Sequence, residues 1–321
     1  MEKRYLFILL IVAQLIAILF LGKKIYIDKA NTLGVSINVD GGVGEAVKKN
    51  PNSTLKYFYE PIANTTVSEV RPWDTSKVIS TTINNDTLNN PTTVPGSAPA
   101  TIMTIGDSFT YGQYVDGKNS WVRLLEKEVQ RTHDVSVVNL GVPGYDIEYS
   151  VERFRIRGPK YNPKLVIWFL KDDDFVSIAE RLTPIIEEEQ KLFEMQEMRE
   201  HKELFIPKQG HSDPIFIERA LNRFLEASGG IKNIYEYQYK KLRLLREYYD
   251  GNIVIVYLPL KVKHLEMLQK WVKSDDKVIL KQLPNLDKNT TFPDGHPNEA
   301  GHQSITQAIF QFLIEKNLLV P

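Results

Sequence analysis

The chain has no cysteine among its 321 residues and no excess of charge of either sign. Without cysteine there is no disulfide framework, thiolate nucleophile, iron-sulfur cluster or cysteine-ligated zinc site. The 40 basic and 40 acidic side chains cancel and are mixed along the chain, which argues against a nucleic-acid binder with a basic face. Any nucleophile must therefore be Ser, Thr, Lys, Tyr or a carboxylate.

Long apolar runs are scarce, and the exception lies near the N-terminus. The run from Tyr5 to Leu21 is apolar except for Gln14, and lysine or arginine flanks both of its ends. As a helix rising about 1.5 Å per residue, this run would extend roughly 25 Å, near the lower limit for crossing a bilayer core. A cleaved signal peptide needs small residues after its apolar stretch, whereas residues 19–21 are large. We predict that residues 1–24 form an uncleaved transmembrane anchor, which crosses the membrane through residues 5–21.

Residues 25–100 are predicted to be a polar tether or N-terminal extension. The sequence there is rich in Asn, Thr, Pro and Ser, and Thr81 to Ala100 is nearly free of charge and of large apolar groups. Such a composition is typical of a surface tether. The segment Leu55 to Pro61 contains enough aromatic residues to form a strand or lip on the main domain.

Residues 101–321 show the alternation of an α/β domain. Continuous apolar runs of strand length predict strands buried on both faces, and an amphipathic helix follows the first of them. The predicted strands are Thr101 to Ile105, Val135 to Leu140, Leu165 to Leu170, Asn252 to Leu258 and, more weakly, Lys277 to Leu283. The predicted helices are Trp121 to Thr132 and a closing helix from Ile305 to Lys316. This order predicts a parallel sheet covered by helices on both sides.

The region from about 178 to 250 is too long for one crossover between strands. It is rich in Glu, Lys, Arg, Met and aromatic residues and contains two helical patterns, at 187–204 and 233–249. We predict a helical insertion. One interpretation is an enlarged crossover with a solvated charged face, and the other is a lid or partner-docking element over the site.

The strand-end loops carry a candidate nucleophile and base. In open parallel sheets the reacting groups collect at the carboxyl ends of strands, and Ser108 follows the first strand closely. Serine needs a base to take its proton. His296, with Asp294 two residues earlier, lies in a Pro/Gly/Asn loop before the closing helix, in the position and order that such a mechanism requires.

The other histidines have weaker settings. Three of them lie in helical or charged stretches: His133, His201 and His264. The fourth, His211, does not follow or precede a predicted strand end. His302 is interpreted as a polar residue at the start of the closing helix rather than as a catalytic residue.

On these motifs the sequence resembles the SGNH/GDSL hydrolases, which are serine esterases on a flavodoxin-like, three-layer α/β/α fold, and within them bacterial members with an N-terminal anchor. The resemblance covers about residues 101–177 and 252–315. GDSFTYG at 106–112, VVNLGVPGYD at 137–146 and DGHPNEAGH at 294–302 correspond to three family blocks in the right order.

The resemblance implies a role for each matched residue. Ser108 would be the nucleophile and its N–H an oxyanion donor, and Gly144 would give a second N–H. His296 would be the base and Asp294 the residue that orients it. Asp294 precedes His296 by two residues where the family more often has three, so Asp287 is kept as a second candidate for the orienting role.

The third family block departs from the pattern, because the stretch 165–175 has no Asn to donate to the oxyanion. Asp173, or Asp172 in another register, occupies that slot, and we assign Asp173 to the oxyanion hole. A carboxylate there opposes catalysis unless it is protonated. Lys171 is an alternative source of positive charge, and a degenerate site of weakened activity is a further interpretation.

The acidic triplet 172–174 offers oxygen ligands that suit Mg²⁺ or Ca²⁺. Three consecutive acids cannot all point into one site from an extended loop, and the Ser/His pattern needs no metal. We therefore predict neither a metal nor a cofactor.

The sequence as a whole predicts a membrane-anchored serine esterase that acts on a small-molecule or carbohydrate O-acyl ester, with no nucleic-acid partner. The alternatives are an O-acetyltransferase of a cell-surface polysaccharide and a catalytically impaired binding domain. We expect a single-pass protein of the cell membrane with its catalytic domain outside the cytoplasm, although basic residues on both sides of residues 5–21 give no firm orientation. The oligomeric state is left open.

Overall fold

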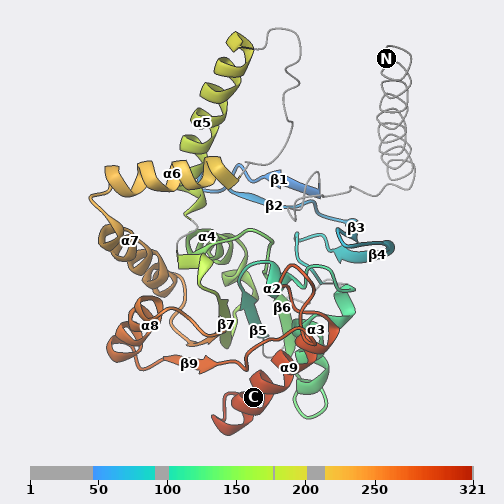
Figure 1. Cartoon of the computed structure of the whole chain (residues 1–321). Coiled ribbons are helices and arrows are strands. Elements are labelled where there is room, and N and C mark those ends of the chain that lie inside the picture. Colours follow the sequence, from blue (N-terminus) through green and yellow to red (C-terminus); the bar gives the residue numbers. More distant parts are fainter. Residues whose placement is uncertain (1–45, 91–100, 176–177, 201–213, 320–321) are drawn as a thin grey trace, which may run out of the picture.

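A parallel sheet of five strands forms the centre of the computed structural model, which describes residues 46–90, 101–175, 178–200 and 214–319 (Figure 1). The strand order is β6-β5-β7-β8-β9. The strands are β5 (Thr101–Ile105), β6 (Ser136–Asn139), β7 (Leu165–Leu170), β8 (Asn252–Tyr257) and β9 (Val278–Gln282). The parallel pairing predicted from the apolar runs is confirmed, including the weak fifth strand.

Helices cover both faces of this sheet. Along β7, which is buried throughout, Ile167 and Phe169 pack with α3 (Trp121–Val129) and α9 (Glu299–Glu315). The alternate residues Trp168 and Leu170 pack on the other face. That face is covered by α4 (Ile147–Arg157), α7 (Ile231–Leu244) and α8 (Val262–Ser274). Alternation along each strand therefore produces the three-layer α/β/α arrangement that was predicted.

Short helices lie between the strands and the longer helices, and among them α2 (Ser108–Tyr111) and η4 (Asp173–Phe175) follow the carboxyl ends of β5 and β7. The remaining short elements of the domain are η2 (Gly117–Asn119), η3 (Pro159–Tyr161) and η5 (Leu245–Glu247). The closing helix α9 begins six residues earlier than the apolar pattern indicated, at Glu299 instead of Ile305. The reason is the Asn298 side chain, which caps it by accepting hydrogen bonds from the N–H groups of Ala300 and Gly301.

The predicted insertion divides into two parts. Helices α5 (Ala179–Glu200) and α6 (Pro214–Ala227) pack on each other and lie at the upper edge of the molecule in Figure 1, away from α3 and α9. Helix α7, by contrast, belongs to the α/β layers, because Leu242 is fully buried in the same core as Trp168. The N-terminal part of α7 still contacts the inserted helices, because Ile234 packs with Leu182 of α5 and Ala220 of α6.

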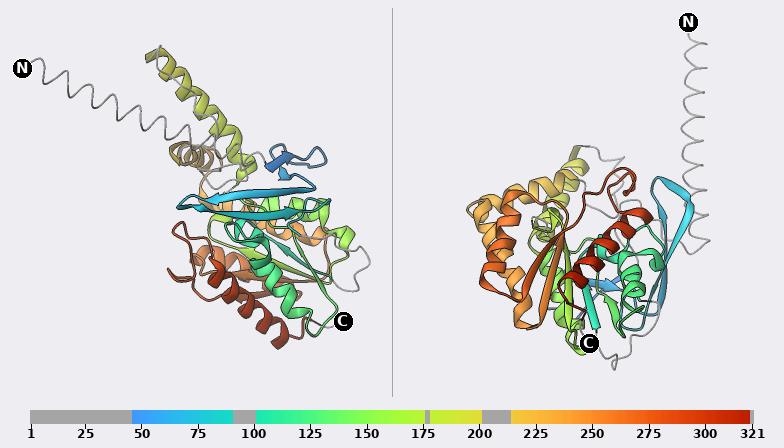
Figure 2. Two further views of the ribbon diagram at one scale, coloured as in Figure 1. Left: turned by 90° about the vertical axis from the view of Figure 1, so that its right-hand side faces the viewer. Right: turned by 90° about the horizontal axis from the view of Figure 1, so that it is seen from below.

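The N-terminal extension is more structured than a tether. Strands β1 (Val47–Lys49) and β2 (Tyr59–Pro61) pair, and β3 (Thr65–Arg71) and β4 (Asp74–Ile83) form a long hairpin that lies against the α/β domain (Figure 2). The expected strand at Leu55 to Pro61 is present at its C-terminal end as β2.

The tether prediction is wrong for residues 81–90, most of which are buried. Polar side chains there pair with the backbone of the α/β domain. Asn90 donates to the carbonyl of Val137 and accepts from the N–H of Asn139, and Asn89 donates to the carbonyl of Tyr111. A composition rich in Asn and Thr, which is typical of a solvated linker, here satisfies buried backbone groups.

The predicted anchor, residues 5–21, lies outside the described residues, as does 91–100. Among the helices that the structure describes, none combines the length and apolar character needed to span a membrane.

Candidate active site

Ser108 lies in a tight turn between β5 and α2. The turn requires glycine at position 106, where φ is 147° and a Cβ atom would lie 2.9 Å from the carbonyl oxygen of Phe169. Asp107 then caps α2 by accepting a hydrogen bond of 3.0 Å from the N–H of Phe109. The Ser108 side chain is thereby held at the carboxyl end of β5, where the sequence predicted it.

His296 and Asp294 lie next to Ser108. His296 Nε2 is 2.9 Å from Ser108 Oγ, and His296 Nδ1 is 2.8 Å from Asp294 Oδ2. Asp294 also accepts a hydrogen bond of 3.1 Å from the backbone N–H of His296, so one carboxylate holds both the ring and the backbone. This double contact explains why a spacing of two residues is sufficient. The structure thus brings together all three residues that the motifs selected.

Asp287, the second candidate for the orienting role, serves the local turn instead. Its carboxylate accepts hydrogen bonds from the backbone N–H groups of Asn289 and Thr290 and from the Thr290 hydroxyl. These hydrogen bonds hold its pKa below the usual value. Asp294, and not Asp287, contacts His296 in the structure.

Gly144 lies in the loop between β6 and α4 with φ at 79°. Tyr59, from β2, donates a hydrogen bond of 2.7 Å to the carbonyl oxygen of Pro143, and a Cβ atom on Gly144 would lie 2.7 Å from the same hydroxyl. Both the backbone conformation and the contact therefore require glycine here. Within the described residues, the backbone N–H groups of Ser108 and Gly144 have no hydrogen-bond partner, so both are available to an oxyanion.

The structure corrects the assignment of Asp173 to the oxyanion hole. Its side chain is 66% exposed and accepts hydrogen bonds from Lys171 Nζ at 2.7 and 2.9 Å. Lys171 is the residue that approaches the nucleophile: its Nζ lies 2.8 Å from Asp107 Oδ2, and the same oxygen lies 3.4 Å from Ser108 Oγ. A carboxylate that accepts from an ammonium offers no donor, so Lys171, the alternative considered from sequence, fits this place better.

Lys171 carries its charge although it is largely buried. Burial lowers the pKa of its ammonium, but the charges of Asp107, Asp174 and Asp173 outweigh that effect and hold the pKa above its usual value. The ammonium also lies 4.7 Å from the centre of the Phe109 ring.

The three acids of the triplet point to different partners. Asp172 binds His264 Nδ1 at 2.7 Å, Asp173 binds Lys171, and the buried Asp174 accepts from the Lys171 N–H at 2.7 Å. Burial, followed by the charge of Asp107, raises the pKa of Asp174. Within the described residues no group of three or more His, Asp or Glu side chains is arranged to hold a metal ion.

His302 is buried and acts as an acceptor inside the fold. Its Nδ1 accepts a hydrogen bond of 3.2 Å from the N–H of Trp121, and burial lowers its pKa to about 3. It therefore remains neutral and lies on the α3 side of the core, as expected for a structural residue.

Sequence reasoning missed the aromatic surroundings of His296. The Tyr114 ring meets the imidazole edge-on at a centroid distance of 5.2 Å, and the Phe109 ring lies at 5.3 Å. Trp73, from the turn of the β3–β4 hairpin, contacts Tyr114 at 5.0 Å. A signal was present, since Trp73 is a large aromatic residue in a polar region predicted to be a tether, but nothing in the sequence placed it near residue 296.

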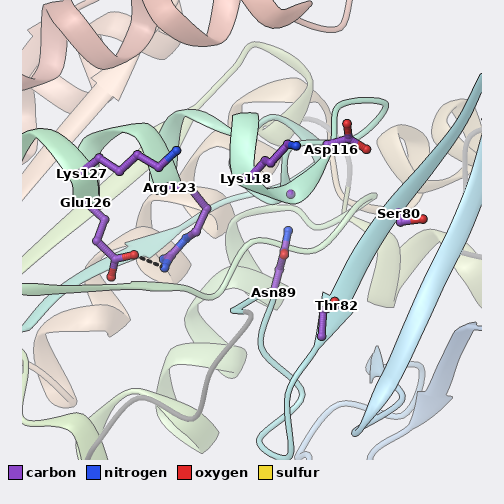
Figure 3. Close-up of a pocket in the computed structure, with 9 residues that line it drawn as sticks. Ser80, Thr82, Asn89, Asp116, Lys118, Arg123, Glu126 and Lys127 are labelled. Carbon is purple, nitrogen blue, oxygen red and sulfur yellow. Dashed lines mark hydrogen bonds and ion pairs between the residues drawn. The ribbon is translucent and has the colours of Figure 1, made fainter.

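A cavity of about 440 Å³ lies apart from these residues, between β4, η2 and α3 (Figure 3). Its walls include Thr82, Asn89, Lys118 and Arg123, and none of the residues that line it belongs to the Ser108 site. The Arg123 guanidinium turns to Glu126 in Figure 3 and pairs with it at 2.5 Å. This cavity therefore offers no group to the chemistry at Ser108.

Residues 104–170 match the model of the GDSL-like Lipase/Acylhydrolase family. The match includes the motifs at 106–112 and 137–146, for which the resemblance to this family is thereby confirmed, whereas the motif at 294–302 lies outside the match. The matched segment contains Ser108 and Gly144 and ends before His296. The match supports an ester-hydrolysing enzyme. No curated protein matches the chain.

Similar solved structures include three esterases. A psychrotrophic esterase from Pseudoalteromonas sp. has 13% identity and a TM-score of 0.42, covering 68% of this chain and 98% of that one. An acetyl xylan esterase from Butyrivibrio proteoclasticus has 15% identity and a TM-score of 0.40, covering 72% and 67%. A Clostridium thermocellum family 3 carbohydrate esterase has 15% identity and a TM-score of 0.39, covering 69% and 99%.

Proposed function

We propose that the protein is a serine esterase whose catalytic residues are Ser108, His296 and Asp294. The observation that carries this proposal is the continuous hydrogen-bond chain from Ser108 Oγ through the imidazole of His296 to the carboxylate of Asp294. Ester hydrolysis by a serine nucleophile requires this arrangement of nucleophile, base and orienting group.

The reaction follows from this geometry. His296 Nε2 takes the proton of Ser108 as Oγ attacks the ester carbonyl carbon, and Asp294 stabilises the imidazolium through Nδ1. The N–H groups of Ser108 and Gly144 hold the tetrahedral oxyanion. The imidazolium then protonates the leaving alcohol, and a water molecule, deprotonated by His296, releases the acyl group from Ser108.

Lys171 supplies positive charge to the same oxyanion in place of the missing amide donor. Its ammonium shares Asp107 Oδ2 with the nucleophile, which places it in the immediate surroundings of Ser108. A fixed cation near a developing negative charge lowers the barrier most when it is largely removed from water, and the Lys171 side chain is 15% exposed.

The test is hydrolysis of a short-chain aryl ester by the full-length chain, compared with Ser108→Ala. We expect the variant to lose at least about 10³-fold in kcat. Equal rates for the two proteins would remove the esterase proposal. Adding a soluble oligosaccharide to the same assay and analysing the products separates water from a sugar hydroxyl as acceptor, and therefore separates an esterase from an O-acetyltransferase.

The substrate class and the location of the enzyme are part of the proposal. The resemblance to the family is compatible with carbohydrate O-acyl or lipid ester substrates, and we propose the former. Acetate release from an acetylated polysaccharide by wild type but not by Ser108→Ala would support a carbohydrate substrate, whereas release of fatty acid from a lipid ester alone would contradict it. We also propose that residues 5–21 anchor the chain in the cell membrane with the catalytic domain outside the cytoplasm. External protease added to intact cells should then digest that domain, and protection of the domain would contradict this orientation.

A further inference from the structure

The turn of the β3–β4 hairpin reaches the loop that carries His296. The hairpin comes from the N-terminal extension, outside the segment that matches the family model. Figure 2 shows it as a two-stranded ribbon lying against the α/β domain. Its residues Glu69, Arg71 and Trp73 make the contacts described below, while the exposed side of the hairpin carries residues such as Lys77 and Val78.

The hairpin holds the backbone of Tyr114 at both polar groups. Glu69 Oε1 accepts a hydrogen bond of 3.2 Å from the Tyr114 N–H, and Arg71 Nε donates one of 3.0 Å to the Tyr114 carbonyl oxygen. Tyr114 has φ at 68°, a left-handed conformation that a residue with a large side chain rarely adopts. The two contacts therefore stabilise a backbone geometry that the isolated loop would not favour.

This geometry directs the Tyr114 ring toward the catalytic histidine. Tyr114 is 3% exposed, and its ring meets the imidazole of His296 at an interplanar angle of 88°. Trp73 packs against Tyr114 and supports it from the hairpin turn. One chain of contacts thus connects the hairpin to the ring of His296.

A second chain of contacts reaches the backbone of the same histidine. The Arg71 guanidinium lies 4.2 Å from the centre of the Phe292 ring, and Trp73 packs against the same ring at 5.3 Å. Phe292 in turn donates its N–H to the carbonyl oxygen of His296 at 2.8 Å. Arg71, which is 7% exposed, also pairs with Glu299 in the first turn of α9.

We propose that residues 69–73 are a positioning element of the active site, with Arg71 as its central positioning residue. They fix the ring of His296 through Tyr114 and its backbone through Phe292, and so hold Nε2 at the distance that proton transfer from Ser108 requires. This inference rests on the proposed esterase function, to which it adds a part that the family segment does not contain.

The test compares two cations of one hairpin in the full-length chain. Arg71 and Lys77 bind the same oxygen of Glu299, at 2.8 and 3.2 Å, but the structure gives Lys77 no contact with Tyr114 or Phe292. We expect Arg71→Met to lower kcat roughly 10- to 100-fold on a short-chain aryl ester, because a small misplacement of a reacting group has effects of this size. KM should change less than about twofold, and Lys77→Met should match wild type.

Two further variants separate positioning from charge and from folding. Arg71→Lys keeps the charge facing Glu299 but loses the Nε donor and the flat guanidinium, so it should resemble Arg71→Met and not wild type. Trp73→Leu removes a half-buried aromatic side chain at the turn and should also lower kcat with little effect on KM. This variant tests the positioning role if Arg71→Met folds poorly. Wild-type kcat in Arg71→Met, or equal losses in Arg71→Met and Lys77→Met, overturns the inference.

Amide hydrogen exchange keeps this test independent of esterase activity. The N–H of Phe292 and its neighbours in residues 291–298 should exchange faster in Arg71→Met than in wild type, and at the wild-type rate in Lys77→Met. If wild type proves no faster than Ser108→Ala, the proposed function fails, and unchanged exchange in Arg71→Met would then reject the hairpin contact as well. If Ser108→Ala is inactive and Arg71→Met is fully active, the positioning role alone fails.

Discussion

Two histidine-aspartate pairs lie at the carboxyl end of the sheet, and their geometry is nearly the same. His296 Nδ1 is 2.8 Å from Asp294, and His264 Nδ1 is 2.7 Å from Asp172. Their surroundings differ: the side chain of His296 is 20% exposed and its Nε2 contacts Ser108, whereas the side chain of His264 is 1% exposed.

The pair with the buried histidine is a packing element. The imidazole of His264 stacks on Phe175 with a centroid distance of 4.6 Å and an interplanar angle of 8°, and within the described residues its Nε2 has no hydrogen-bond partner. A histidine-aspartate pair is therefore not sufficient for catalysis. Chemistry at this edge requires access to substrate and a nucleophile on the second ring nitrogen, and Ser108 supplies it only to His296.

Replacing each of the two histidines separately should show the largest difference between the two pairs. His296→Gln removes the base, and we expect kcat for an aryl ester to fall by about 10⁴-fold or more. His264→Gln should leave kcat within about threefold and lower the stability of the fold by roughly 1 to 3 kcal/mol, because a buried, packed ring is lost. Steady-state kinetics and thermal unfolding of both variants measure this, and a comparable loss of kcat in His264→Gln would show that the two pairs are not distinct.

The orienting carboxylates give the next largest contrast. Asp294→Asn keeps the shape of the side chain but no longer stabilises the imidazolium, so kcat should fall roughly 10²- to 10⁴-fold. Asp172→Asn keeps an acceptor for His264 and should change kcat little. If the two substitutions lowered kcat equally, Asp172 would have to contribute to the reaction as well.

The cation beside the nucleophile is expected to have an intermediate effect. Lys171→Met removes its charge while keeping much of its volume, and kcat should fall roughly 10²-fold, which is typical for the loss of one group that stabilises the oxyanion. KM should change little, since the charge develops only in the transition state. A loss in KM with kcat preserved would instead assign Lys171 to substrate binding.

The buried carboxylate of Asp146 predicts an effect of pH on stability. Burial raises the pKa of Asp146 from 3.8 to about 7, although it accepts hydrogen bonds from the N–H groups of Tyr149 and Ala179. Between about pH 4 and 7 the folded state therefore binds more protons at this residue than the unfolded state, so this contribution to stability falls as pH rises through that window.

Asp146→Asn does not titrate and should remove that part of the slope. Chemical denaturation at pH 5 and pH 7.5 measures it: the difference in unfolding free energy between the two pH values should be smaller in the variant. An unchanged difference would show that Asp146 has its ordinary pKa in the folded state.

The smallest effect is expected at Asp173. Its exposed carboxylate partly neutralises Lys171, so Asp173→Asn should raise kcat by about two- to fivefold at low ionic strength, and less at high salt. A large fall in kcat would show that the carboxylate itself is needed at the site, and would restore the assignment made from sequence.

The sequence was sufficient for the sheet and for the residues at its carboxyl end. Strands such as Leu165 to Leu170 are apolar throughout, and this pattern has few other interpretations at that length. Ser108 and His296 were found because each follows or precedes an element with a clear pattern. Their proximity follows from the topology, since the carboxyl ends of parallel strands lie at one edge of the sheet.

The remainder depended on contacts that no local pattern encodes. The hairpin packs on Tyr111 through Val67 and Ile83. Its residues Arg71, Glu69 and Trp73 add contacts with residues far along the chain. Counting residues along the third block favoured Asp173, whereas in the structure the Lys171 side chain pairs with Asp107, next to Ser108, and Asp173 is exposed. Such directions are set by packing in three dimensions and not by spacing in sequence.

The side chains around the outer strand β6 have a consequence for the behaviour of the protein in solution. An exposed sheet edge is a template on which strands of other molecules can pair. Here Glu126 accepts from the N–H of Val137, Asn90 and Arg123 donate to the carbonyl of Val137, and Asn90 accepts from the N–H of Asn139. These three backbone groups are already occupied by side chains of the same chain, so another strand could pair with them only by displacing those side chains.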